Sequence, residues 1–195
     1  MFGATLSMSL MAVLGREVSR EINTTTLMLW RGALSLPIII ALALVLGMGP
    51  KDLVTRRPIL HVARNCIHFV AQYCWFFALT LIPLAQLFAL EFMMPLWIAV
   101  LAPILIRERL TPARAAAAIV GFIGVLIVVR PTTATLNTGT IAALLCAICF
   151  ALSIIAVRDL TRTDTTLKIL FWMTLIQTIL ALAVNAGSYV VPSPL

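Results

Sequence analysis

Charged residues are scarce in this 195-residue sequence, and acidic residues are the scarcest of them. Lys, Arg, Asp and Glu make up 11% of the chain, and only 7 residues are Asp or Glu. Soluble domains carry about 25% charged residues and are about 45–50% apolar, whereas 62% of this chain is apolar. The composition argues against a soluble enzyme, a disordered chain and a nucleic-acid-binding protein. It predicts an integral membrane protein embedded in a lipid bilayer, because the cations behind the net charge of +7 lie in short breaks between apolar runs.

Several chemical motifs are also missing. The sequence has no Gly-rich phosphate loop for ATP, no HExxH or GxSxG motif, and no histidine cluster for iron. Cys146 and Cys149 have the spacing of a redox pair, but no charged neighbour favours a thiolate there, and zinc would need more ligands nearby. We therefore expect no cofactor and no metal site. All four cysteines are interpreted as small apolar packing residues: Cys66, Cys74, Cys146 and Cys149.

Seven apolar runs are present, and all but the first, which is short, are near the length of about 20 residues that a transmembrane helix needs. They are residues 1–14, 27–46, 66–82, 84–106, 113–129, 139–157 and 169–186. The runs do not alternate in polarity as the strands of a membrane barrel do, so they predict an all-α membrane protein, a multi-span helical bundle. Pro83 predicts a tight hairpin between the third and fourth helices. Thr111 and Pro112 predict the start of the fifth, as its N-cap and first residue.

Basic residues are distributed unevenly among the links between these runs, and such a bias sets the orientation of membrane proteins. With the N-terminus inside, the inner links hold ten of the 14 Lys and Arg residues. The outer links hold Arg16, Arg20 and Arg130, and Arg31 lies within a span. The sequence therefore predicts a protein of the bacterial cytoplasmic (inner) membrane with its N-terminus inside.

The sequence also contains an internal echo. Residues 16–20 and 158–162 both read Arg, acid, apolar, hydroxyl, Arg, and a tryptophan follows each after ten residues, Trp30 or Trp172. An odd number of spans, five, separates the two copies, so they face opposite sides of the membrane, as in the inverted repeats of many secondary transporters. Chance similarity between two loops is the alternative.

The echo predicts how the chain is organised. Residues 1–130 would form a complete first repeat of five helices, residues 131–138 an outer linker, and residues 139–195 the first two helices of a second, partial repeat. Counterparts of the third to fifth runs are missing, so we expect a fragment, the product of a truncated gene, or a chain completed by another one. The first helix is expected to lack its front edge.

A set of short motifs resembles a known family. The motifs are Ala78-Leu79, Pro83-Leu84-Ala85, Pro95, Arg107-Glu108-Arg109-Leu110 and Gly121-Phe122-Ile123-Gly124-Val125. In this order they resemble the EamA domain of the drug/metabolite transporter superfamily, and the resemblance covers essentially the whole chain. It implies ten helices with both termini inside, a central cavity between two repeats, and export or uptake of small metabolites. This chain departs from that pattern by ending after seven helices.

Glu91 is a lone carboxylate inside the fourth run, with apolar residues on both sides. A charge at the centre of a span costs about 2.5–3.5 kcal/mol on insertion scales, so such residues usually face a cavity or a partner. We expect Glu91 either to couple transport to protons or to bind a substrate amine. The alternative is a neutral side chain that is hydrogen-bonded to a neighbouring helix.

A polar stripe on the third run extends this candidate site. His61, Asn65, His68 and Gln72 recur at intervals of four, three and four residues, so they share one helix face, which Trp75 continues. In lipid such a face must turn inward. We expect Asn65, His68 and Gln72 to line a cavity, with His68 as a titrating group, and interhelical hydrogen bonding is the alternative. His61 is expected to be solvated at the cytoplasmic interface.

Other residues show weaker patterns. Arg31 lies near the start of the second run beside Trp30, and we expect it to extend to the outer surface; binding of a substrate carboxylate is the alternative. Ala117, Gly121 and Gly124 on the fifth run suit close helix packing, either within the chain or in a homodimer. A polar face on the seventh run is interpreted as packing: Thr174, Gln177, Thr178 and Asn185.

Together these features predict a secondary transporter that moves small organic solutes across the inner membrane by alternating access, with proton coupling through Glu91. The alternatives are an inactive remnant or an assembly partner of a membrane complex, and an intramembrane enzyme built on the two histidines and Glu91.

Overall fold

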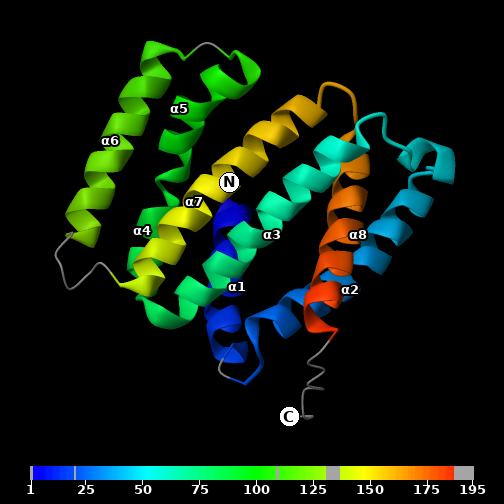
Figure 1. The fold of residues 1–195 in the computed structure, drawn as a ribbon, viewed down its shortest axis with the longest axis horizontal. Coiled ribbons are helices and arrows are strands. Elements are labelled where there is room, and N and C mark those ends of the chain that lie inside the picture. Colours follow the sequence, from blue (N-terminus) through cyan, green and yellow to red (C-terminus); the bar gives the residue numbers. More distant parts are fainter. Residues whose placement is uncertain (1, 20, 109, 131–136, 187–195) are drawn as a thin grey trace.

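The computed structural model describes residues 2–19, 21–108, 110–130 and 137–186, and within these ranges every regular element is a helix (Figure 1). The elements are α1 (Phe2–Val18), α2 (Thr24–Val45), the 3-10 helix η1 (Pro50–Leu53), α3 (Pro58–Leu81), α4 (Leu84–Glu91), α5 (Met94–Ile106), α6 (Pro112–Val129), α7 (Thr138–Leu160) and α8 (Thr166–Asn185). The expected all-α bundle is confirmed. Most of the linker expected at 131–138, and residues 187–195 of the second repeat, lie outside the described residues.

Five segments are long and apolar enough to cross a membrane: α2, the stretch Leu84–Ile106 formed by α4 and α5, α6, α7 and α8. They confirm five of the seven expected spans on grounds of length and composition. The other two expected spans are helices that fall short of this measure, because α1 has only 17 residues and α3 carries the polar stripe. With 24 residues, α3 is still about 36 Å long, which exceeds a hydrocarbon core of about 30 Å.

Local sequence signals explain several helix ends. The α3–α4 hairpin turns at Ile82 and Pro83, as expected. Thr111 caps α6, because its hydroxyl accepts a hydrogen bond from the backbone N–H of Arg114 at 3.4 Å, which also confirms the expectation. At the end of α3, the carbonyls of Leu79 and Ile82 accept hydrogen bonds from Arg16 of α1. Arg16 thus satisfies carbonyls that lack partners within their own helix.

The fourth apolar run, expected as one span, consists of two helices. α4 ends at Glu91, Phe92 and Met93 form a turn, and α5 begins at Met94. Pro95 explains this break. It has no N–H group, so the carbonyl of Glu91, four residues earlier, loses its helical hydrogen bond. The break therefore leaves Glu91 at a helix end within the span.

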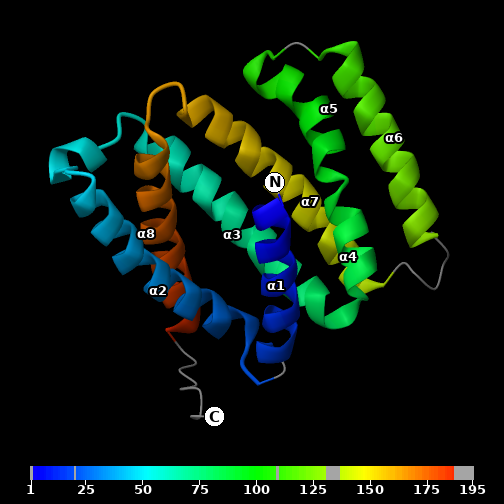
Figure 2. The same ribbon diagram turned by 180° about the vertical axis from the view of Figure 1, so that it is seen from behind.

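The helices pack around a crossing of α3 and α7, and α2 lies beside α8 (Figure 1). α1 lies on the face that is turned away in Figure 1 and is seen in front in Figure 2. α6 is peripheral and packs on α4 and α5. The apolar core lies mainly between α3, α4 and α7. It includes Trp75, Phe76, Leu79, Leu87 and Cys146.

Two glycines permit close contact between the first and last parts of the chain. At Gly32 on α2, a Cβ would lie 2.7 Å from Thr178 Oγ1 and 3.3 Å from Thr178 Cα on α8. At Gly139 on α7, a Cβ would lie 2.8 Å from Ile82 Cγ2 at the α3–α4 turn. Any larger residue would push these helices apart.

The small residues of α6 behave differently. Nothing lies within 4 Å of where a Cβ would be at Gly121 or Gly124, and Ala117 is exposed. All three line an apolar groove of about 560 Å³ between α6 and the α4–α5 segment. Close packing of these residues within the chain is not seen among the described residues, and the homodimer alternative stays a prediction.

The loops that carry the two copies of the internal echo lie at opposite ends of the bundle. In Figure 1 the α1–α2 loop is at the bottom, and the α7–α8 loop is at the top together with η1 and the α5–α6 connection. We call these the lower end and the upper end. An inverted repeat requires this opposite placement, and the repeat itself and its boundaries stay predictions.

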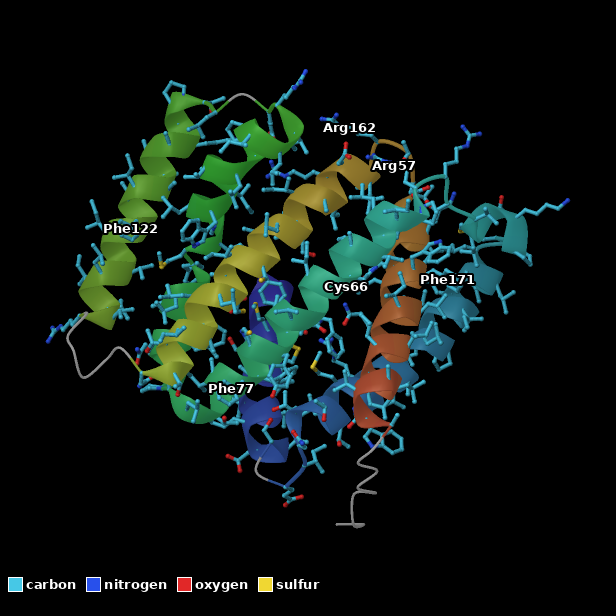
Figure 3. The ribbon with its side chains drawn as sticks, viewed as in Figure 1. Arg57, Cys66, Phe77, Phe122, Arg162 and Phe171 are labelled. Atoms are coloured by element: carbon cyan, nitrogen blue, oxygen red, sulfur yellow. The ribbon has the colours of Figure 1, made fainter. Side chains whose placement is uncertain are left out.

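The four cysteines are free. Cys146 is buried, and Cys74 and Cys149 are partly buried, as expected of packing residues. Cys66 is exposed on α3 (Figure 3), so the expected packing role is wrong there.

Candidate functional site

Five of the six predicted site residues line one small cavity. Glu91, His68, Gln72, Trp75 and Arg31 border a space of about 110 Å³. These residues and their neighbours come from α1, α2, α3, α4 and α7, so the cavity lies where five helices meet. The other lining residues are Met8, Met11, Phe76 and Phe150.

Glu91 is held in place by α3. Trp75 Nε1 donates a hydrogen bond to Glu91 Oε2 at 3.0 Å. The Trp75 ring packs edge-on against Phe76, with ring centroids 5.1 Å apart, so the donor is itself fixed. Among the described residues, the second carboxylate oxygen, Oε1, has no hydrogen-bond partner. Glu91 therefore presents one oriented, unoccupied oxygen.

His68 connects α3 with α7. Its Nε2 lies 3.0 Å from Gln72 Nε2, and its Nδ1 lies 3.2 Å from Ser153 Oγ. An amide N–H can only donate, so in this arrangement Nε2 accepts and Nδ1 carries the proton that it donates to Ser153. The His68 ring also lies 5.2 Å from that of Phe150. Both ring nitrogens are engaged, which fixes the side chain. The Oε1 atom of Gln72 is buried without a partner.

Arg31 lines the same cavity from α2, although the sequence favoured a surface position. Its guanidinium has neither an ion pair nor a hydrogen-bond partner among the residues that the structure describes. Its neighbour Trp30 is 48% exposed and is not among the residues that line the cavity. The cavity thus contains a cation with free donors, which favours an anionic ligand group.

Asn65 is not among the residues that line the cavity. It has no exposed surface. Its Nδ2 donates to the carbonyl of His61 at 2.8 Å, and its Oδ1 accepts from Arg64 at 2.9 Å. Its backbone carbonyl accepts from Gln177 of α8 at 3.0 Å. Both side-chain contacts lie within α3, and only the backbone carbonyl is bonded to another helix. Among the described residues, the Asn65 side chain therefore neither lines the cavity, which was the expectation, nor forms the alternative hydrogen bond between helices.

His61 is fully buried. The expectation from the sequence, a solvated side chain at the cytoplasmic interface, is therefore wrong. Its Nε2 lies 2.9 Å from Asp164 Oδ2, which also accepts from Thr55 Oγ1 at 2.7 Å. Lys168 Nζ lies 3.5 Å from the other carboxylate oxygen. Burial alone would raise the pKa of Asp164, but the hydrogen bonds with His61 and Thr55 and the charge of Lys168 outweigh it and lower the pKa. We call Thr55, His61, Asp164 and Lys168 the Asp164 cluster.

Further ionic contacts join the same parts of the chain at the upper end. Arg57 lies 2.5 Å and Arg162 3.8 Å from the carboxylate of Asp159, and Figure 3 shows the two arginines close together. Glu108, before α6, accepts from Arg158 of α7 at 2.7 Å. These contacts therefore join the first part of the chain, up to Glu108, to the end of α7 and the α7–α8 loop.

The polar face of α8 packs against the bundle, as expected. Asn185 Nδ2 donates to the carbonyl of Thr25 at 2.9 Å, and Gln177 reaches Asn65. The residues of this face are all buried: Thr174, Gln177, Thr178 and Asn185.

The sequence model of the EamA-like transporter family matches residues 1–130. The chain belongs to this family. The match covers α1 to α6, and therefore four of the five helices that surround the cavity. It confirms the resemblance inferred from the short motifs.

Curated relatives of this EamA-like chain are transporters rather than enzymes. An S-adenosylmethionine uptake transporter of Rickettsia prowazekii (strain Madrid E) is 28% identical over 155 residues, which cover 80% of this chain and 53% of that protein. A riboflavin transporter of Brucella anthropi is 28% identical over 149 residues, covering 76% and 52%. The pseudopaline exporter CntI of Pseudomonas aeruginosa (strain PAO1) is 24% identical over 194 residues, covering 98% and 67%. The chain spans about half the length of the first two relatives.

A solved crystal structure shares the fold of this family member. It has a TM-score of 0.70 and 24% sequence identity, and the match covers 94% of this chain and 65% of that one. Together with the apolar helices, the bacterial transporter relatives support an inner-membrane location.

Some cavity residues of this EamA-like chain had no signal in the sequence. Met8, Met11, Phe76 and Phe150 are apolar residues in apolar helices, where lining a cavity and filling a core give the same pattern. Ser153 was missed because its partner His68 is 85 residues away. Among the described residues, no three His, Cys, Asp or Glu side chains are grouped so that they could hold a metal ion.

Proposed function

We propose that this chain belongs to a secondary transporter that moves a small organic metabolite across the inner membrane by alternating access. The observation that supports this most is the cavity itself. It gathers Arg31, His68, Gln72 and Glu91 at the meeting point of five apolar helices. Ionisable residues at membrane depth commonly mark solute or ion pathways, because they are expensive to keep there.

The relatives support a small solute but not one particular solute. Their names specify S-adenosylmethionine, riboflavin and pseudopaline, and they include both uptake and export. Membership in the same family supports a related task for this chain, with the solute chosen by its own cavity residues.

The contacts at the upper end suit alternating access. The cavity lies between helices of the first part of the chain and α7, and these parts are joined at the upper end by ionic contacts such as Arg57–Asp159 and Glu108–Arg158. In this proposal the contacts form when the cavity is closed toward the upper end and separate when it opens there.

Proton coupling is assigned to Glu91. This carboxylate has one oxygen bound to Trp75 and one that is open to the cavity. A proton and a cationic solute group would compete for the open oxygen, so that loading of one releases the other.

The test is transport by the purified, full-length protein in lipid vesicles. Vesicles loaded with unlabelled S-adenosylmethionine, riboflavin or amino acids are diluted into the labelled solute, and accumulation is measured between pH 5.5 and 8.5. We expect accumulation for at least one solute, and we expect Glu91→Gln to remove its pH dependence. The amide oxygen of Gln still accepts from Trp75 but cannot titrate.

The matched control is Glu21→Gln, because Glu21 is exposed in the α1–α2 loop. This variant should keep the wild-type pH profile. Transport that is equally pH-dependent in Glu91→Gln vesicles would contradict proton coupling through Glu91, and failure of every solute to accumulate would contradict the transport function.

A further inference from the structure

We propose that the cavity binds the zwitterionic head of an α-amino acid, with the carboxylate on Arg31 and the ammonium group on Glu91. This inference rests on the proposed transport function and names the chemical class of the solute's charged end. The observation that supports it is that Arg31 and Glu91, which have opposite charges, line one cavity without pairing with each other.

Arg31 and Glu91 form no ion pair with N···O within 4 Å, and neither charge is paired with another of the described residues. Opposite charges attract strongly where water is scarce, and an isolated buried charge is costly. A ligand that carries both an anion and a cation would compensate both groups at once. A purely anionic solute would leave Glu91 without a cation, and a purely cationic solute would leave Arg31 without an anion.

The anionic side of the site matches a carboxylate. A guanidinium presents a planar fork of N–H donors that fits the two oxygens of a carboxylate. None of the Arg31 donors is used by the described residues, so the whole fork is open to a ligand.

The cationic side offers an oriented acceptor. Trp75 holds Glu91 Oε2, which leaves Oε1 for a ligand. Gln72 lines the same cavity, although its Oε1 is itself buried without a donor. An ammonium group has three N–H donors, and one of them can donate to Glu91 Oε1. His68 takes part indirectly, because its contacts with Gln72 and Ser153 fix the position of the amide.

The size of the cavity limits what it can enclose. Its volume of about 110 Å³ is well below the roughly 300–1,000 Å³ of pockets that surround a drug-sized ligand. It therefore suits the charged head of a solute rather than a whole cofactor. The rest of the solute would extend along Met8 and Met11 of α1, which border the cavity and are 37% and 38% exposed.

The experiment measures equilibrium binding to the purified, full-length protein with two matched sets of probes. One set is L-methionine, L-methioninamide and N-acetyl-L-methionine, and the other is the same trio built on L-phenylalanine. Within a set the side chain is constant, while the amide lacks the carboxylate and the acetyl derivative lacks the ammonium group. We expect at least one parent amino acid to bind about tenfold or more tightly than both of its derivatives, since each loses a charged hydrogen bond.

Two variants assign the contacts. Arg31→Met should weaken binding of the parent amino acid about tenfold or more and leave binding of the amide unchanged. Glu91→Gln should weaken binding of the parent amino acid by a similar factor and leave binding of the acetyl derivative unchanged. The matched controls, Arg56→Met and Glu21→Gln, remove exposed charges outside the cavity and should bind as the wild type does. Arg31→Lys keeps the positive charge but lacks the planar fork of N–H donors. Its affinity for the parent amino acid should lie between those of the wild type and Arg31→Met.

Each outcome decides the inference without relying on any one variant being folded. If neither parent amino acid binds better than its derivatives to the wild-type protein, the inference is wrong. It is also wrong if Arg31→Met weakens the parent and the amide equally. If solutes cross the vesicle membrane but no zwitterion binds, the transport function is supported and the zwitterion site is contradicted. If a zwitterion binds but no solute is transported, the zwitterion site is supported and the transport function is contradicted.

Discussion

Asp164 connects three segments of the chain through a single carboxylate. Thr55 precedes α3, His61 lies in its first turns, and Lys168 belongs to α8. All three contact Asp164, which is 7% exposed. Removing one member would leave buried polar atoms without partners, which costs about 1–3 kcal/mol for each group. The Asp164 cluster should therefore contribute to the stability of the upper end.

The lowered pKa of Asp164 predicts how this contribution depends on pH. The carboxylate has a lower pKa in the folded than in the unfolded chain, where it is about 3.9. Its stabilising effect is therefore complete above about pH 4 and is lost as the pH falls through the folded value. We expect Asp164→Asn to lower the melting temperature at pH 6, and we expect the difference from the wild type to be smaller at pH 3. Thermal unfolding in detergent at both pH values measures this.

The control for this prediction is Glu21→Gln, which removes an exposed carboxylate at the other end of the bundle. It should leave the melting temperature unchanged at both pH values. An Asp164→Asn variant that melts like the wild type at pH 6 would show that the Asp164 cluster adds no stability.

Single residues also show where prediction from sequence works. His68, Gln72 and Trp75 were recognisable because they share one face of a helix, and Glu91 because it is a lone charge in an apolar run. His61 was misinterpreted for the opposite reason. Its partner Asp164 is 103 residues away, and no local pattern reveals a contact between distant loops. Without that partner, a histidine near a helix start looks solvated.

At the scale of helices, the break between α4 and α5 sets the position of Glu91. Pro95 deprives the Glu91 carbonyl of its helical donor, and the chain turns at Phe92 and Met93. The hairpin at Pro83 was predicted because two runs together were too long for one span. The break at Pro95 was not, because membrane helices tolerate proline when neighbours compensate, so a proline inside a span-length run does not specify where the helix stops.

The break leads to a prediction for Pro95→Ala. Alanine restores the missing N–H and favours one continuous helix, which would turn Glu91 away from Trp75. A displacement of about 1 Å in a binding site can cost up to about a hundredfold in activity. We expect transport by Pro95→Ala to fall roughly tenfold to a hundredfold, without loss of thermal stability, because proline disfavours a helix interior. Vesicle transport and thermal unfolding measure the two effects.

Pro103→Ala provides the matched control, since Pro103 lies inside α5 but does not border the cavity. It makes the same chemical change in the same helix and should transport as the wild type does. Equal transport by Pro95→Ala and wild type would show that the break is not needed to position Glu91.

At the scale of the whole molecule, the two ends of the bundle are held together by different chemistry. Ionic contacts join the first and last parts of the chain at the upper end, including Arg57–Asp159 and Glu108–Arg158. Among the described residues, neutral hydrogen bonds join these parts at the lower end. Examples are Gln86 to Thr140 at 3.0 Å and Asn185 to the carbonyl of Thr25 at 2.9 Å. Ionic contacts weaken with salt when they are exposed, so the two ends would open under different conditions.

The same asymmetry predicts the orientation in the membrane. Basic residues gather at the upper end, and the positive-inside rule assigns such an end to the cytoplasm. Glu21 and Thr161 are exposed in the loops at the lower and upper ends, so cysteines at these positions report on the two sides. In a background without the four native cysteines, Glu21→Cys should react with a membrane-impermeant maleimide added to intact cells. Thr161→Cys should react only after the cells are opened. The reverse pattern would place the N-terminus outside, and labelling of both from one side would contradict the inverted arrangement of the two echo loops.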